Sequence, residues 1–226
     1  MGRDEFDARM QIQLPLVLAS VAGSVDVIGL VSFKLFTAHI TGNLVLIADQ
    51  LVRAGPPKVD EVLAVPVFIT AVAAVWLISK LSGRKGPPLV RLLLVLHLLM
   101  LTAVWVLSLL EHPALKPAGL RAGVEAMIAV SAMACQFTLL QIGIPGAPST
   151  AVMTGNMTNS VLSLLEFLTP GEPIKKLDSG RPTRSLELIG CFFAGCLAGA
   201  AACSWIGDWA WSLPVALAGV ALAISR

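Results

Sequence analysis

Six apolar segments, each long enough to cross a bilayer as a helix, divide this 226-residue chain. Roughly 20 helical residues span the ~30 Å hydrocarbon core of a membrane. The hydrophobic fraction is 56% and the charged fraction only 13%, whereas an average soluble domain is roughly a quarter charged. The predicted fold class is all-α, a polytopic integral membrane protein with about six transmembrane helices plus two half-helices. The expected spans are Leu14–Phe33, Val62–Ser79, Leu89–Leu110, Val124–Ile144, Leu186–Ile206 and Trp209–Ile224.

The tripeptide Thr-Gly-Asn occurs twice in matching surroundings, half a chain apart. One copy is Thr41-Gly42-Asn43 and the other is Thr154-Gly155-Asn156, an offset of 113 residues (154 minus 41). Each copy follows a long apolar segment and precedes a shorter one. This pattern predicts a single membrane domain (1–226) built from two internal repeats, over 12–110 and 121–225.

The apolar segments after the two motifs are too short to cross a membrane. Leu44–Val52 and Met157–Leu168 would be roughly 14 to 18 Å long as helices. Asn is a favoured N-cap, and the preceding Gly allows a sharp entry of the chain, so we expect a half-helix to begin at each Gly-Asn. Non-helical backbone at membrane depth survives only where it is buried in protein or lines a wet cavity. In transporters, such breaks mark a binding site at the repeat interface.

Two topologies are open. Re-entrant half-helices give six spans and inverted three-plus-three repeats, whereas half-helices that complete a crossing give eight spans and parallel repeats. In both topologies, Lys and Arg residues are concentrated on the side of the membrane where the two termini lie. The positive-inside rule therefore predicts a protein of the cell (inner) membrane with both termini in the cytoplasm. The shortness and polarity of the half-helices favour six spans.

Asp26 is the one carboxylate deep in the first apolar segment. An ionisable group at such a depth costs roughly 2.5–3.5 kcal/mol on insertion scales, so it is a functional candidate by default. It would then be a proton carrier, or a ligand for a cation or substrate. The alternative is a hydrogen-bonded Asp that caps a neighbouring broken helix.

The motif residues supply the other candidates, because the N-terminus of a half-helix presents free N–H groups and a positive dipole end. Thr and Asn side chains add donors and acceptors without the cost of a charge. The alternative is that the motifs only cap two helices that cross in the bundle. The full set of candidate substrate-binding residues is Asp26, Thr37, His39, Thr41, Gly42, Asn43, Gln136, Thr150, Thr154, Gly155, Asn156, Thr158 and Asn159.

Several other classes of function find no support in the sequence. There is no basic patch with interleaved aromatic residues for nucleic acid, no motif of a soluble enzyme, and no ligand spacing for a metal or cofactor. Gly195 and Gly199 have the small-xxx-small spacing of close helix packing. They could serve contact between the repeats or a homodimer.

The ordered motifs resemble the YoaK family of bacterial multi-pass membrane proteins (domain of unknown function 1275). The resemblance lies in Ala22-Gly23-Ser24-Val25-Asp26, in Phe36–Asn43, in Gln136 and in Ser149–Asn159, and it covers nearly the whole chain. His39 stands where the family usually has Asn, and Phe137 follows Gln136 where Asn is common. The resemblance implies a membrane location and a fold, but no activity.

Two classes of function remain. The first is a small transporter or channel, in which a polar solute or ion binds between the Thr-Gly-Asn half-helices and Asp26 couples to protons. The second is a non-transport protein, a scaffold that binds membrane lipid or a partner, in which the motifs are architectural. A membrane-embedded enzyme is a third and weaker interpretation, because no catalytic constellation supports it.

Overall fold

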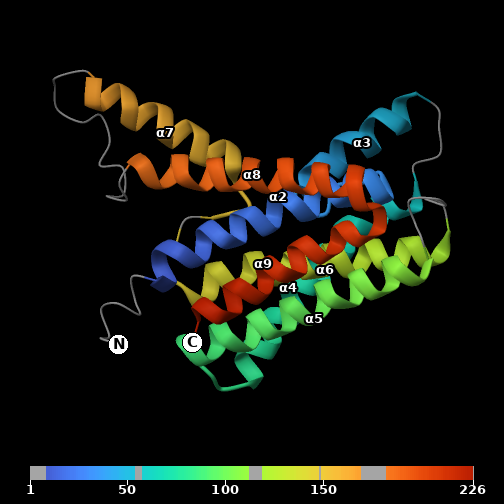
Figure 1. Cartoon of the computed structure of the whole chain (residues 1–226), viewed down its shortest axis with the longest axis horizontal. Coiled ribbons are helices and arrows are strands. Elements are labelled where there is room, and N and C mark those ends of the chain that lie inside the picture. The colour runs from blue at the N-terminus through green and yellow to red at the C-terminus, as the bar shows by residue number, and fades with distance from the viewer. Residues whose placement is uncertain (1–8, 54–57, 112–118, 148, 169–181, 226) are drawn as a thin grey trace.

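In the computed structural model the described residues, 9–53, 58–111, 119–147, 149–168 and 182–225, form helices and turns with no strand among them (Figure 1). A π-helical turn, Arg9–Gln13, leads into the first helix. The helices are α2 (Leu14–Phe33), α3 (Ile40–Val52), α4 (Val59–Leu81), α5 (Pro87–Glu111), α6 (Leu120–Gly143), α7 (Met153–Leu168), α8 (Pro182–Ile206) and α9 (Ser212–Ile224), with a 3-10 turn at Gly207–Trp211 between the last two. The all-α fold class is confirmed for this part of the chain.

Five helical stretches of the described chain are long and apolar enough to cross a membrane. Four correspond to α2 with the turn before it, α4, α5 and α6. The fifth, Arg184–Ile224, is a run of 41 residues that holds both α8 and α9. These lengths and compositions are those of a multi-pass membrane protein.

The long helices lie side by side as a bundle, and the start of α2 and the end of α9 are at the same end of it (Figure 1). Met10 and Leu14 belong there to one hydrophobic cluster with Ala221. At this end, the guanidinium of Arg91 on α5 donates a hydrogen bond to the carbonyl of Ser225. The first and last described segments are therefore held together by direct contacts.

Helices α2 and α8 approach each other more closely than ordinary side chains allow. A Cβ atom added at Gly195 would lie 2.2 Å from the carbonyl oxygen of Ser20, and one added at Gly23 would lie 2.1 Å from that of Phe192. The Ser20 hydroxyl also donates to the carbonyl of Cys191 at 3.0 Å. Glycine at these positions therefore permits backbone-to-backbone packing between the first half of the chain and the second.

Gly199 also faces α2, where an added Cβ would be 3.1 Å from the Ser24 backbone. The spacing of Gly195 and Gly199 is thus accounted for by contact within one chain. A homodimer through the same two glycines would have to displace α2 from this face of α8.

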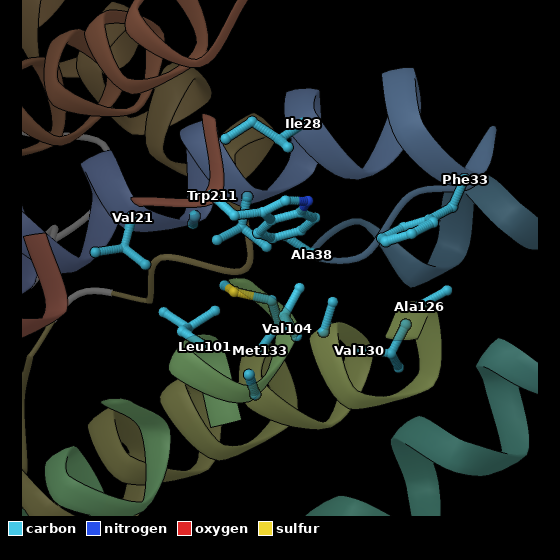
Figure 2. Close-up of a cluster of buried hydrophobic side chains, with 14 of the residues drawn as sticks. Val21, Ile28, Phe33, Ala38, Leu101, Val104, Ala126, Val130, Met133 and Trp211 are labelled. Atoms are coloured by element: carbon cyan, nitrogen blue, oxygen red, sulfur yellow. The ribbon is translucent and has the colours of Figure 1, made fainter. Parts of the chain in front are cut away.

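A hydrophobic core fills the space between α2, α5, α6 and the turn before α9. Trp211 is fully buried and stacks on Phe33, with ring centroids 5.8 Å apart. Figure 2 shows Leu101, Val104 and Met133 gathered beneath that indole. This core fixes α2, and with it the position of the polar residues on that helix.

Helices α3 and α7 begin beside the α2–α8 pair and diverge from it in opposite directions (Figure 1). Asn43 is the buried residue of α3, and α7 buries Asn156 and Ser160. Most of their apolar side chains are exposed, for example Val45 at 68% and Leu165 at 53%. The described buried residues of each short helix therefore lie in its first two turns.

The expectation that the half-helices begin at the Gly-Asn steps is wrong by one turn. Helix α3 begins at Ile40 and α7 at Met153, so both Thr-Gly-Asn motifs lie inside the first turns. The N-cap residue of α3 is His39, whose carbonyl accepts the Gly42 N–H at 2.8 Å. Neither Asn is an N-cap, because each is the fourth residue of its helix. Each Asn side chain instead reaches back to the loop before its helix, as described next.

Candidate functional site

The carboxylate of Asp26 holds the loop that joins α2 to α3. Its Oδ1 atom accepts the backbone N–H groups of Thr37 at 2.9 Å, Ala38 at 2.9 Å and His39 at 3.4 Å. Asp26 is buried in α2. Three donors on one carboxylate oxygen satisfy backbone groups that would otherwise be orphaned ahead of a helix. This geometry is the hydrogen-bonded capping role that the sequence left open.

The imidazole of His39 completes the environment of that carboxylate. Nδ1 of His39 lies 2.7 Å from Oδ2 of Asp26, and the His39 side chain remains 31% exposed. The hydrogen bond to Asp26 raises the pKa of His39, and burial opposes this shift. The pair is therefore an ion pair when the ring is protonated and a neutral–anion hydrogen bond when it is not.

Helix α8 forms another wall around His39. The rings of His39 and Phe192 meet edge to face, with centroids 5.3 Å apart. Because Phe192 is also the residue whose carbonyl nearly touches Gly23, the α2–α8 packing places this aromatic ring. The Asp26–His39 pair thus lies where the loop from the first half meets a helix from the second.

Thr37 packs into the same cluster. Its hydroxyl donates to the Val25 carbonyl at 3.2 Å, and its methyl group occupies the space beside Gly29, where an added Cβ would lie 2.7 Å away. Thr37 is fully buried. It serves to fix the loop and offers no atom to solvent.

Asn43 makes a reciprocal pair of hydrogen bonds with the backbone of Phe36. The Phe36 N–H donates to Oδ1 at 2.9 Å, and Nδ2 donates to the Phe36 carbonyl at 2.7 Å. Gly42 lies against the Phe36 ring, and a Cβ atom added to Gly42 would lie 2.9 Å from that ring. The first motif therefore closes its own loop.

The second half repeats part of this arrangement. Asn156 donates from Nδ2 to the Ser149 carbonyl at 2.9 Å, so both Asn residues bond to the residue seven positions earlier. Gln136 on α6 donates to the Leu18 carbonyl of α2 at 2.9 Å and lies 3.4 Å from the Thr150 hydroxyl. Gln136 is fully buried, and its Oε1 atom has no hydrogen-bond partner among the described residues.

The structure therefore brings Asp26, Thr37 and His39 into one cluster, and Gln136 and Thr150 into another. The remaining candidates do not join either cluster. Thr41, Thr154, Thr158 and Asn159 are exposed on the short helices, and the Thr158 hydroxyl is used on the Thr154 carbonyl at 3.0 Å. Gly155 rests against the side chain of Val152.

Two buried charged residues, Glu61 and Glu125, were missed by the sequence reasoning. Glu61 is 2% exposed, although its position at the edge of a polar connector gave no signal of burial. It accepts a hydrogen bond from Gln50 Nε2 at 2.6 Å and lies 3.4 Å from Lys58 Nζ. These contacts fasten the end of α3 to the start of α4. Within the described residues, no group of His, Cys, Asp and Glu has the arrangement of a metal site.

The comparisons with known proteins give one finding. A family model described as a protein of unknown function, DUF1275, matches residues 14–224. No curated protein and no solved structure matches the chain.

Proposed function

The chain belongs to the DUF1275 family of proteins of unknown function, and from this premise we propose that it is a small transporter or channel for a polar solute or ion. The proton-carrying centre is the Asp26–His39 pair. The solute binds beside it, where α3 begins. The proposal applies to a membrane protein, which is what the lengths and compositions of its apolar helices indicate.

The observation that carries the proposal is the 2.7 Å contact between Asp26 and His39 inside an apolar helix bundle. Intramembrane ionisable residues are costly, and they commonly mark proton or substrate paths. Three backbone N–H groups would suffice to hold a loop, so the imidazole is an addition that capping does not need. Its partial exposure gives a proton on His39 a way out, whereas Asp26 beneath it is buried.

The arrangement of the two halves supports the same proposal. Asn43 with Phe36 and Asn156 with Ser149 make corresponding contacts 113 residues apart (156 minus 43). Helix α3 runs outward towards one end of the bundle and α7 towards the other (Figure 1). We interpret the halves as inverted repeats with two re-entrant short helices, an arrangement found in secondary transporters.

Six crossings follow from this interpretation. A continuous helix of 41 residues would be roughly 60 Å long, about twice the hydrocarbon core. The break at Gly207–Trp211, where Gly207 has φ 57°, divides the Arg184–Ile224 run into two crossings. Six crossings leave both ends of the chain on one side, and the Lys and Arg residues on that side favour the cytoplasm of the cell (inner) membrane.

The test is flux in liposomes containing purified full-length protein, with a panel of ions and polar metabolites and an imposed pH gradient. We expect the wild type to move at least one solute in a pH-dependent manner. Asp26→Asn should abolish that pH dependence, and His39→Asn should weaken it. Asp49→Asn is the matched control, since Asp49 is an exposed acid on α3. Equal pH dependence in the wild type and both site variants would exclude the proton-carrying centre.

A scaffold without transport is the second candidate, and a specific observation favours it. The amides of Asn43 and Asn156 both hydrogen-bond to their own loops, and α3 and α7 diverge from each other towards their C-terminal ends (Figure 1). If the wild type moves no solute of the panel while Asp26→Asn is unstable in detergent, the motifs are architectural and the scaffold is the better description.

A further inference from the structure

We propose that the groove between α4 and α6 is a binding site for an anionic phospholipid, with its headgroup at the α4–α5 turn and one acyl chain along α4. The inference is independent of transport. It rests on two neighbouring cavities, one basic and one apolar, which share Trp76 and Ile142 in their walls.

The basic cavity lies at the turn between α4 and α5 and has a volume of about 280 Å³. Lys80, Arg84 and Lys85 line it together with Trp76, and no carboxylate is among its described lining residues. Lys80 Nζ lies 5.5 Å from the centroid of the Trp76 ring, which directs that cation towards the cavity wall. Three cations around one hollow provide charge complementarity for a phosphate group.

The turn that carries these cations has a defined shape. Gly83 and Gly86 have φ values of 63° and 60°, a left-handed conformation that costs glycine little. The Arg84 N–H donates to the Ser82 hydroxyl at 3.3 Å. Arg84 and Lys85 are therefore presented by a short turn between two apolar helices, and Lys80 by the last turn of α4.

The second cavity is an apolar groove of about 630 Å³ beside the first. Ile69, Val72, Ala73 and Trp76 form one face of α4 along it, at helical spacing, and Phe137 of α6 forms the other side. From Lys80 back to Ile69 the helix rises roughly 16 Å, about half of the hydrocarbon core. That is the depth that one leaflet's acyl chain occupies.

The position along the helix decides the occupant. Lys80 is next to the last residue of the Val59–Leu81 stretch, so the basic cavity lies at the membrane–water interface if α4 spans the bilayer. Trp76 is 51% exposed, as is common for Trp at headgroup depth. Gln141, which lines the groove next to Ile142, places an amide near this level for the ester groups. A free anion would use the basic cavity alone, whereas a phospholipid uses both.

Lipid binding can be measured by native mass spectrometry on the full chain in detergent, with phosphatidylglycerol, phosphatidylcholine and glycerol 3-phosphate as probes. We expect phosphatidylglycerol to bind tightest. Arg84→Gln with Lys85→Gln should weaken phosphatidylglycerol binding by about fivefold per cation, on the order of twentyfold together. The control, Lys34→Gln with Arg53→Gln, removes the same charge at the ends of α2 and α3 and should leave binding within about twofold.

A second pair of variants tests the groove. Ala73→Trp fills it and should weaken binding of phosphatidylglycerol, whereas Ala74→Trp, at an exposed residue outside the groove lining, should not. Equal binding of the two lipids by the wild type would overturn the proposal, as would equal losses in both charge variants. Glycerol 3-phosphate binding as tightly as the lipid, with no effect of Ala73→Trp, would show a site for free anions instead.

Discussion

Asn43 and Phe36 exchange two hydrogen bonds, at 2.9 and 2.7 Å, across the loop that enters α3. The side chain amide thus serves as both acceptor and donor for one backbone residue. Asn156 bonds to Ser149 through Nδ2. The two motifs share a sequence and a position at the start of a helix. Among the described contacts, Asn43 makes two side-chain hydrogen bonds to its loop, whereas Asn156 makes one.

The first prediction compares these two residues. Asn43→Ala leaves a backbone N–H and a carbonyl without partners, so the free energy of unfolding should fall by about 2–3 kcal/mol. Asn156→Ala should cost about 1 kcal/mol. Asn159→Ala, at an exposed residue of α7, should stay within about 0.5 kcal/mol. Denaturant unfolding in detergent measures all three. If Asn159→Ala lost as much unfolding free energy as Asn43→Ala, the hydrogen bonds of the motifs would not be the cause of the losses.

The second prediction concerns the α2–α8 contact. Gly195→Ala places a Cβ atom 2.2 Å from the Ser20 carbonyl oxygen, and neither backbone can move away without separating the helices. We expect a loss of about 3 kcal/mol or more, at the upper end of overpacking effects. The matched control is Gly190→Ala, also in α8, which meets nothing within 4 Å and should be neutral or slightly stabilising. Thermal unfolding of both variants in the same detergent provides the measurement.

The third prediction is a pH dependence that arises at His39. The hydrogen bond to Asp26 raises the pKa of His39 in the folded protein. A raised pKa means that the folded state binds the proton more tightly than the unfolded state. The resulting stabilisation is therefore complete below the unfolded value of 6.5 and disappears as the pH rises through the folded value.

Unfolding temperatures recorded from about pH 5.5 upwards, with the wild type compared to His39→Asn, test this. The wild type should lose stability relative to the variant above about pH 6.5. Asp26→Asn, which removes the negative charge beside His39 but keeps the imidazole, should show less of this pH dependence than the wild type. If the wild type instead gained stability relative to His39→Asn as the pH rises, the sign would be wrong and the assignment to His39 would be contradicted.

Much of the fold could be predicted from the sequence, because long apolar runs leave a chain few alternatives in a bilayer. The helix starts could not. The start of α3 at Ile40 depends on where the loop N–H groups find an acceptor, and the acceptor is a carboxylate eleven or more residues earlier, on another helix. Local propensity around Gly42 and Asn43 contains no information about that partner.

The candidate site was predictable in part for the same reason. Asp26 could be identified because a charge within an apolar run is conspicuous, and the structure places it beside His39. Thr41 and Thr154 share the motif but are exposed and make no described side-chain contact with that cluster. The spacing of Gly195 and Gly199 looks identical for contact within a chain and between chains, so only the position of α2 decides between them.

The fourth prediction separates the shape of Asp26 from its charge. Asn at this position keeps an Oδ1 acceptor for the N–H groups of Thr37, Ala38 and His39, and its amide can donate to Nδ1 of a neutral imidazole. Asp26→Asn should therefore cost less than about 1 kcal/mol of unfolding free energy. Asp26→Ala leaves three buried donors unpaired, and should cost about 3 kcal/mol or more.

Chemical denaturation in detergent, with circular dichroism to verify helix content, compares the two variants. Because Asn preserves the loop, any change in flux that Asp26→Asn causes can be assigned to the lost charge and not to a misplaced α3. If Asp26→Ala is as stable as Asp26→Asn, then the carboxylate does not hold the loop, and the three N–H groups must find other acceptors in its absence. A loss of several kcal/mol in both variants would show instead that the loop requires the negative charge, as an ion pair with protonated His39 would.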